Sequence, residues 1–276
     1  MEEYPDEDTC LDAIFNDRYG DVKQCPNPQC FRDTTFYRIK GRKCYSCMHC
    51  GYQLHPLAET IFHKSSTPLT KWFYAMYLFS VSKNGVAAKE LERHLGVTYK
   101  TAHRMARQIR SLMSERGRIG GSGSVIEADE TYYGKKVPAR GARPEKSAVL
   151  GVIERGGQAR VKVIPKTTSR DISRFFYESV DSQSTLYTDE SPMYKWANAL
   201  MVHESINHSK EEYARGGVST NTIEGFWGQV KRSISGTYHF VSPKYLQLYV
   251  DEFAFRYNLR GEVVYPVLLK RASRHV

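Results

Sequence analysis

The sequence predicts an α/β domain that follows a small cysteine-rich module and a helical segment. All six cysteines fall within the first 50 residues, and a helical pattern nearly free of Gly occupies residues 67–113. From residue 124 onward strand and helix patterns alternate, after a Gly/Ser break at 117–123. These three observations define the fold class, and the elements are taken below in chain order.

The composition is that of a folded protein with unevenly distributed charge. Hydrophobic residues make up 41% of the chain, and the longest apolar stretch, 72–81, is too short to span a membrane. Residues 1–20 hold seven acidic residues and one Arg, whereas 21–120 hold 17 Lys and Arg against six Asp and Glu. This basic excess indicates a polyanionic partner. The absence of a signal-peptide pattern in the acidic start predicts a cytoplasmic protein.

Four cysteines are spaced as two metal-binding knuckles with 16 residues between them. They are Cys25, Cys30, Cys47 and Cys50. Zinc takes four soft ligands in a tetrahedron, and two close pairs on facing turns supply them, so we expect one structural zinc ion beside a ribbon hairpin near 34–41. The gap of four residues in the first knuckle leaves alternatives open: Cys44 could replace Cys47, and His49 or His55 could compete.

A helix-turn-helix pattern occupies residues 89–113. Gly96 ends the first helix, Thr98 caps the second, and a helix over 72–79 would complete the bundle. The second helix has one apolar face and one cationic face, which we expect to bind DNA. The cationic residues are Lys100, His103, Arg104, Arg107 and Arg110. The basic loop 135–146 is the alternative DNA site.

The α/β part is expected to contain four strands and three helices. The predicted strands span 124–133, 148–154, 159–164 and 185–187, and the helices span 169–180, 221–235 and 243–258. Asp129 lies on the first strand, Asp189 follows the last, and Glu224 lies at the start of the second helix. Carboxylates of this kind hold Mg²⁺ or Mn²⁺, and two ions about 3.5–4 Å apart promote in-line displacement at phosphorus. We therefore expect the three acids to meet at one edge of the sheet.

Neighbouring residues allow competing interpretations. Strand alternation places Glu127 on the face of the first acid and Glu130 on the opposite face. The first turn of the second helix could be a capping box in which Glu224 reaches back to the cap amide, and Asp189 could be a helix cap. Lys231, two turns after Glu224, would lie on the same helical face and hold a phosphate of the DNA.

Several motifs are shared, in order, with a known family. They are Asp129-Glu-Thr-Tyr, Tyr187-Thr-Asp189, Asn207-His-Ser, Thr220-Asn-Thr-Ile-Glu224, Tyr238-His-Phe-Val-Ser and Asp251-Glu-Phe-Ala-Phe-Arg-Tyr-Asn258. Through them the chain resembles ISXO-type insertion-sequence transposases, relatives of the eukaryotic Merlin elements, from residue 24 to 260. The resemblance implies a ribonuclease-H-like mixed sheet with Asp129, Asp189 and Glu224 as the metal-binding triad. Asn221 is the rival for the third position.

The resemblance also implies an activity: metal-dependent cleavage at transposon ends and transfer of the 3′-hydroxyl into target DNA. Its partners would be terminal inverted repeats and target DNA, bound by a homodimer or larger assembly associated with the nucleoid. The alternative is a catalytically silent, domesticated DNA-binding regulator; a nuclease without strand transfer ranks third. Three intact acids favour the enzyme, because a scaffold has no physical need for mutually repelling carboxylates.

The predicted domain boundaries follow from these patterns. They are an acidic leader over 1–23, a zinc ribbon over 24–56, a helix-turn-helix domain over 67–116, a ribonuclease-H-like catalytic domain over 124–260, and a basic tail over 261–276.

Overall fold

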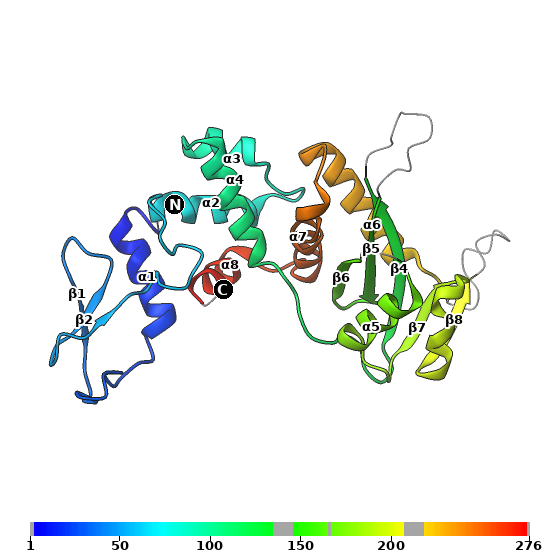
Figure 1. The fold of residues 1–276 in the computed structure, drawn as a ribbon, viewed down its shortest axis with the longest axis horizontal. Helices are drawn as coiled ribbons and strands as arrows, with labels where there is room; N and C mark the ends of the chain where they lie inside the picture. The colour runs from blue at the N-terminus through cyan, green and yellow to red at the C-terminus, as the bar shows by residue number, and fades with distance from the viewer. Residues whose placement is uncertain (1–2, 135–145, 165–166, 207–217, 275–276) are drawn as a thin grey trace. The chain divides into compact units, whose positions relative to one another are not determined.

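The computed structural model describes residues 3–134, 146–164, 167–206 and 218–274. The motif that begins at Asn207 and all of the basic loop 135–146 except Lys146 lie outside these residues. The chain divides into two compact units (Figure 1). One comprises Met1–Leu112 with Glu262–Val276, and the other comprises Met113–Gly261. Within the described ranges no helix is long and apolar enough to cross a membrane.

The cysteine-rich module of the first unit is a small antiparallel sheet. Its strands are β1 (Phe36–Arg38), β2 (Tyr45–Cys47) and β3 (Gln53–Leu54), in that order. The expected hairpin strand near 34–41 corresponds to β1. With so few residues per strand, the sheet has little core of its own, and Phe15 of a neighbouring helix packs against Phe36 and Tyr45.

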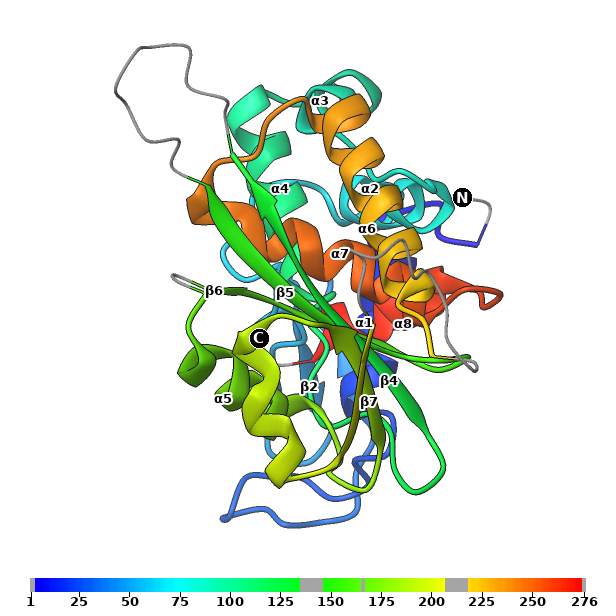
Figure 2. The same cartoon turned by 90° about the vertical axis from the view of Figure 1, so that its right-hand side faces the viewer.

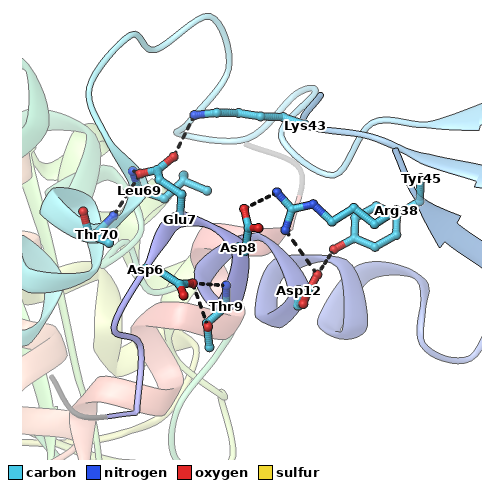
Figure 3. A network of polar contacts seen from close by, with 10 residues as sticks. All are labelled: Asp6, Glu7, Asp8, Thr9, Asp12, Arg38, Lys43, Tyr45, Leu69 and Thr70. Carbon is cyan, nitrogen blue, oxygen red and sulfur yellow. Dashed lines mark hydrogen bonds and ion pairs between the residues drawn. The ribbon is translucent and has the colours of Figure 1, made fainter. Parts of the chain in front are cut away.

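That helix is α1 (Glu7–Tyr19), which forms from most of the acidic leader. Asp6 caps its first turn by accepting a hydrogen bond from the Thr9 amide at 2.8 Å. The acidic side chains of α1 then pair with the ribbon, as Figure 3 shows: Asp8 with Arg38 at 2.5 Å and Glu7 with Lys43 at 3.0 Å. The leader is therefore an ordered part of the ribbon module.

Glu7 also joins the ribbon module to the helical bundle. Its carboxylate accepts hydrogen bonds from the amides of Leu69 and Thr70, at the start of α2 (Leu69–Val81). Pro68, the residue before α2, offers no side-chain cap, so an acid from a distant helix satisfies these amides and complements the helix dipole.

The helical bundle consists of α2, α3 (Ala88–Leu95), α4 (Tyr99–Ser111) and α8 (Val264–Ser273). Gly96 takes the left-handed conformation (φ 58°) that ends α3, and Thr98 caps α4 through the Thr101 amide. The expected basic tail is instead mostly helical. Leu268 and Ala272 are fully buried, and α8 packs against α1 and α2, so apolar burial holds this segment in the first unit.

The second unit is built on a five-stranded mixed sheet. Its strands are β4 (Val125–Tyr133), β5 (Ser147–Glu154), β6 (Ala159–Ile164), β7 (Thr185–Asp189) and β8 (Val202–Ile206). The order is β6-β5-β4-β7-β8; β5 is antiparallel to β4 and β6, whereas β7 and β8 run parallel to β4. This topology confirms the expected ribonuclease-H-like fold.

Helices cover both faces of this sheet (Figure 2). On one face α5 (Ser169–Ser179) and the 3₁₀ helix η1 (Pro192–Ala199) bury Ile126, Leu150 and Leu186. On the other face α6 (Asn221–Ser233) and α7 (Leu246–Asn258) bury Val149 and Ile153. A π-helix, η3 (Ile234–Tyr238), and a 3₁₀ turn, η4 (Pro243–Tyr245), connect α6 to α7.

Side chains of α7 complete the hydrogen bonding of the edge strand β6. The Val163 amide donates to Gln247 Oε1 at 2.7 Å, and the Ala159 amide donates to Asn258 Oδ1 at 2.6 Å. These bonds cover amides that would otherwise be open to pairing with another chain. The last residue of the shared motif at 251–258 therefore has a structural role.

Candidate functional site

The two strand acids are neighbours because their strands are parallel and in register. Glu127 of β4 pairs with Tyr187 of β7, and an acid follows two residues later on each strand: Asp129 in the middle of β4 and Asp189 as the last residue of β7. Both point to the face covered by α6, whose first turn carries Glu224. Burial, together with the negative charges of Glu130, Asp189 and Glu224, raises the pKa of Asp129 to about 7. The structure thus places Asp129 where the charges of both Asp189 and Glu224 act on it.

Glu130 points to the opposite face of the sheet, as strand alternation predicted. Its carboxylate accepts a hydrogen bond from the Tyr194 hydroxyl of η1 at 2.8 Å. Burial raises the pKa of Glu130, and the charge of Asp189 adds to that effect. The region around the candidate triad therefore contains four carboxylates, which repel one another unless a cation or a proton is present.

A buried Glu on β4 holds the start of α6, and sequence reasoning assigned it no role. Glu127 is fully buried and accepts hydrogen bonds from the amides of Thr222 (2.8 Å) and Ile223 (3.1 Å) and from the Thr222 hydroxyl (2.9 Å). Arg155 pairs with it at 2.6 Å. The available signal was an acid between the apolar Ile126 and Ala128 in a buried strand.

Arg155 extends the same network to two more elements. Its Nη2 donates to the carbonyl and the hydroxyl of Ser219, at 2.8 and 2.7 Å, just before α6. Its guanidinium also lies over the ring of Tyr187 on β7, 4.9 Å from the centroid. We call Glu127, Arg155, Tyr187, Ser219, Thr222 and Ile223 the Glu127–Arg155 network.

The capping-box interpretation of Glu224 is wrong, because α6 begins one residue earlier and is capped differently. Thr220 is the N-cap and makes no side-chain cap bond; Glu127 accepts the amides instead. Glu224 is exposed, and one of its oxygens accepts a hydrogen bond from the Thr220 hydroxyl at 2.7 Å. Asn221, the rival third ligand, is also exposed, in the first turn of α6.

Asp189 combines a turn role with its place beside Asp129. One carboxylate oxygen accepts the Ser191 amide at 3.1 Å, and Ser191 in turn caps η1. Ser191, and not Asp189, is therefore the helix cap, and Asp189 contributes only by accepting the Ser191 amide. A single amide bond leaves the second carboxylate oxygen of Asp189 with capacity for a metal ion.

Lys231 lies on the exposed side of α6 and lines a groove of about 240 Å³. Tyr133, His239 and Phe240 also line this groove. His239 has a left-handed backbone (φ 58°), and it follows the π-helix that ends α6. The proposed contact of Lys231 with a DNA phosphate stays a prediction.

The four cysteines of the two knuckles form one cluster. Their sulfur atoms all lie within 4.8 Å of one another, and those of Cys25 and Cys50 are 3.6 Å apart. Tetrahedral zinc with Zn–S bonds of about 2.3 Å places its sulfurs ~3.8 Å apart, so the cluster fits the ion. The competing side chains turn elsewhere: Cys44 contacts Gln53, and His49 contacts the Asp33 carbonyl.

The helix-turn-helix face differs from expectation at one residue. Arg110 is 2% exposed, donates to the Val86 carbonyl at 2.8 Å and lies over the Phe79 ring. Its predicted role in DNA binding is wrong, because the guanidinium is buried in the bundle. The helical period had placed it on the cationic face.

The other cationic residues of α4 are at least partly accessible. Lys100 and Arg107 are exposed, and His103 is half-buried. Arg104 is also half-buried; it donates to the Ser65 hydroxyl at 3.0 Å and lies 5.5 Å from the Trp72 ring centroid. Lys100 and Arg107 are therefore the strongest candidates for phosphate contacts.

Comparison with known families identifies the second unit. Residues 120–258, just over half of the chain, match the family model described as the ISXO2-like transposase domain. The chain belongs to the ISXO2-like transposase family. Residues 5–53 match the transposase zinc-ribbon domain, a span that includes α1. This transposase-family assignment confirms the resemblance found in the motifs.

The chain is also similar to individual proteins and solved structures. An "uncharacterized protein in transposable element ISH50" from Halobacterium salinarum is 27% identical over 242 residues, covering 80% of this chain and 79% of that protein. Among solved structures, a chain of a simian T-cell lymphotropic virus intasome has a TM-score of 0.31 at 14% identity, over 64% of this chain and 66% of that one, slightly under two thirds of its length. The Mos1 transposase paired-end complex has a TM-score of 0.27 at 10% identity, over 74% and 80%.

Proposed function

We propose that this protein is a DNA transposase that cleaves DNA at the ends of an insertion element and joins the freed 3′-hydroxyl to a target strand. Asp129, Asp189 and Glu224 would hold the divalent metal ions, Mg²⁺ or Mn²⁺, that this reaction needs. One observation carries the proposal. The charges of Asp189 and Glu224 both act on Asp129, although these acids come from two parallel strands and a helix, within a domain of the ISXO2-like transposase family.

The raised pKa of Asp129 supports a cation at this site. Clustered carboxylates favour a proton when no metal is present, and a divalent ion displaces that proton because its ligands must be ionised. When bound, the ions would activate the attacking oxygen and stabilise the leaving one. The protein's own contribution would be to hold three acids at fixed spacing and to keep the scissile phosphate in line with them.

DNA binding is proposed for the exposed cationic part of α4. Lys100 and Arg107 would contact phosphates, with His103 and Arg104 at the edge of the surface. Such contacts place a duplex without reading its sequence. Two element ends must meet before joining, which favours a homodimer or larger assembly during the reaction.

A structural role is proposed for the zinc ion. The Cys25, Cys30, Cys47 and Cys50 sulfurs would complete a closed tetrahedron with no position left for substrate. The ion would hold together strands of only two or three residues, which bury too little surface to fold alone.

The test is a cleavage and joining assay with purified protein, Mg²⁺ and a duplex that carries the end of the encoding element. We expect cleaved and joined products with the wild type, and neither with Asp189→Asn, which should still bind the duplex. Asp181→Asn is the matched control, because Asp181 precedes β7 and so lies at the opposite end of that strand from Asp189. This variant should behave as wild type. Binding without any cleavage by the wild type would favour the silent regulator instead.

A further inference from the structure

The Glu127–Arg155 network contacts every element that carries a candidate metal ligand. Glu127 precedes Asp129 by two residues on β4, and Tyr187 precedes Asp189 by two residues on β7. Thr222 precedes Glu224 by two residues in the first turn of α6. In a strand, residues two apart share a face and lie about 6.6 Å apart, so the network forms a layer directly behind both strand carboxylates.

The network also links the sheet to the start of α6 through polar contacts. Glu127 accepts three hydrogen bonds from Thr222 and Ile223, each between 2.8 and 3.1 Å. Arg155 adds two bonds to Ser219, the residue before the N-cap of α6. Charged groups make stronger hydrogen bonds than neutral ones, and a carboxylate at a helix N-terminus also complements the helix dipole.

Fold stability alone does not call for a charged pair at this place. An ion pair with one fully buried partner is often no more stabilising than apolar residues of the same volume. The pair does offer directional bonds, since the planar guanidinium reaches Glu127 with one nitrogen and Ser219 with another. Directional bonds fix the axial position and rotation of α6, and these determine where Glu224 stands relative to the sheet.

We propose that Glu127 and Arg155 are positioning residues that set the spacing between the strand carboxylates and Glu224, and thereby the affinity of the site for divalent metal ions. This inference rests on the proposed function, because it assumes that the three acids bind metal. Mg²⁺ demands near-ideal octahedral geometry, so a small displacement of one ligand weakens binding. Loss of groups that hold metal ligands typically lowers metal affinity about 10–100-fold.

The experiment measures Mn²⁺ binding directly, by calorimetry on the intact protein without DNA. Glu127→Gln should weaken Mn²⁺ binding at least about tenfold, because Gln can still accept an amide bond but leaves Arg155 without its charge partner. Arg155→Lys keeps a positive charge beside Glu127 but cannot also reach Ser219, so it should give an intermediate loss. Thr222→Val, which removes only the hydroxyl bond, is the mildest variant and should weaken binding less.

The matched control is Glu252→Gln. Glu252 is equally buried and pairs with Arg256 at 2.7 Å on α7, in the same unit but outside the network. Its loss should lower the melting temperature as Glu127→Gln does and leave Mn²⁺ affinity unchanged. Equal Mn²⁺ affinity for Glu127→Gln and Glu252→Gln would overturn the inference. If instead the wild type and Asp129→Asn bind Mn²⁺ equally, the proposed function itself fails.

Discussion

Replacing Asp129 by Asn should make the zinc-loaded protein more stable at neutral pH when no Mg²⁺ is present. The folded structure raises the pKa of this carboxyl from 3.8 to about 7, first through burial and then through the charges of Glu130, Asp189 and Glu224. Each pKa unit corresponds to about 1.36 kcal/mol, so a shift of about three units amounts to about 4 kcal/mol. Because the side chain is partly exposed, we expect a gain of about 2–4 kcal/mol in the free energy of unfolding above pH 7.

The sign follows from proton binding in the two states. Between the unfolded pKa near 4 and the folded pKa of about 7, the folded protein keeps a proton on Asp129 that the unfolded chain has released. The contribution of this group to stability is therefore full below pH 4 and is lost as pH rises to 7. Asn carries no titrating proton, so the variant should lack this part of the pH dependence.

Urea denaturation of the zinc-loaded protein, in buffer without Mg²⁺ and in excess Mg²⁺, provides the assay. Saturating Mg²⁺ at 100 times its dissociation constant should stabilise the wild type by about 2.7 kcal/mol and leave Asp129→Asn unaffected. Asp251→Asn is the control: burial raises the pKa of Asp251 to about 7 as well, but it lies on α7 and accepts a bond from Gln247. That variant should gain stability equally with and without Mg²⁺. An Asp129→Asn protein less stable than wild type in buffer without Mg²⁺ would refute the reasoning.

Four further outcomes are expected. Arg110→Ala should lower the free energy of unfolding by about 2–4 kcal/mol in chemical denaturation, because it empties a buried site, and leave the salt slope of DNA binding unchanged. Arg107→Ala should reduce that slope by about one with little change in stability; equal slopes for both variants would contradict the assignment. Cys25→Ser should abolish zinc binding and unfold the ribbon. One equivalent of zinc retained by this variant in metal analysis would contradict the prediction. Lys231→Ala should slow cleavage about tenfold, equivalent to about 1.4 kcal/mol in the activation barrier, whereas Arg232→Ala should not. Equal, small effects of both variants would mean that Lys231 is an ordinary solvent-exposed residue.

The strand and helix patterns predicted the core of the second unit closely, because apolar alternation there reflects burial. β4, β5 and β6 match the predicted ranges to within one residue. β8 was not predicted, since it is an edge strand whose central residues are polar and mostly exposed, with hydrogen bonds to β7 alone supporting it. The segment of α8 was expected to be a basic tail, because its Lys and Arg residues concealed the buried apolar positions Leu268 and Ala272.

The candidate site, too, was only partly predictable from the sequence. The sequence order placed three acids on strand, strand end and helix, which was enough to expect them together. It gave no indication that Glu127 would cap α6 from 95 residues away, because that contact depends on tertiary packing. For Arg110 the sequence predicted a role that the structure contradicts. Helical periodicity placed it on the cationic face, but its guanidinium is buried in the helical bundle, where it contacts Phe79 and Val86.

The most direct test of the central claim is the anomalous diffraction of Mn²⁺ in crystals of this protein. The account predicts at least one Mn²⁺ peak within about 2.0–2.2 Å of carboxylate oxygens from Asp129, Asp189 and Glu224 together, with a second ion about 3.5–4 Å away when DNA is bound. A peak that uses Asn221 in place of Glu224 would change the third ligand. Well-ordered crystals with no Mn²⁺ between the strand acids would contradict the proposed metal site.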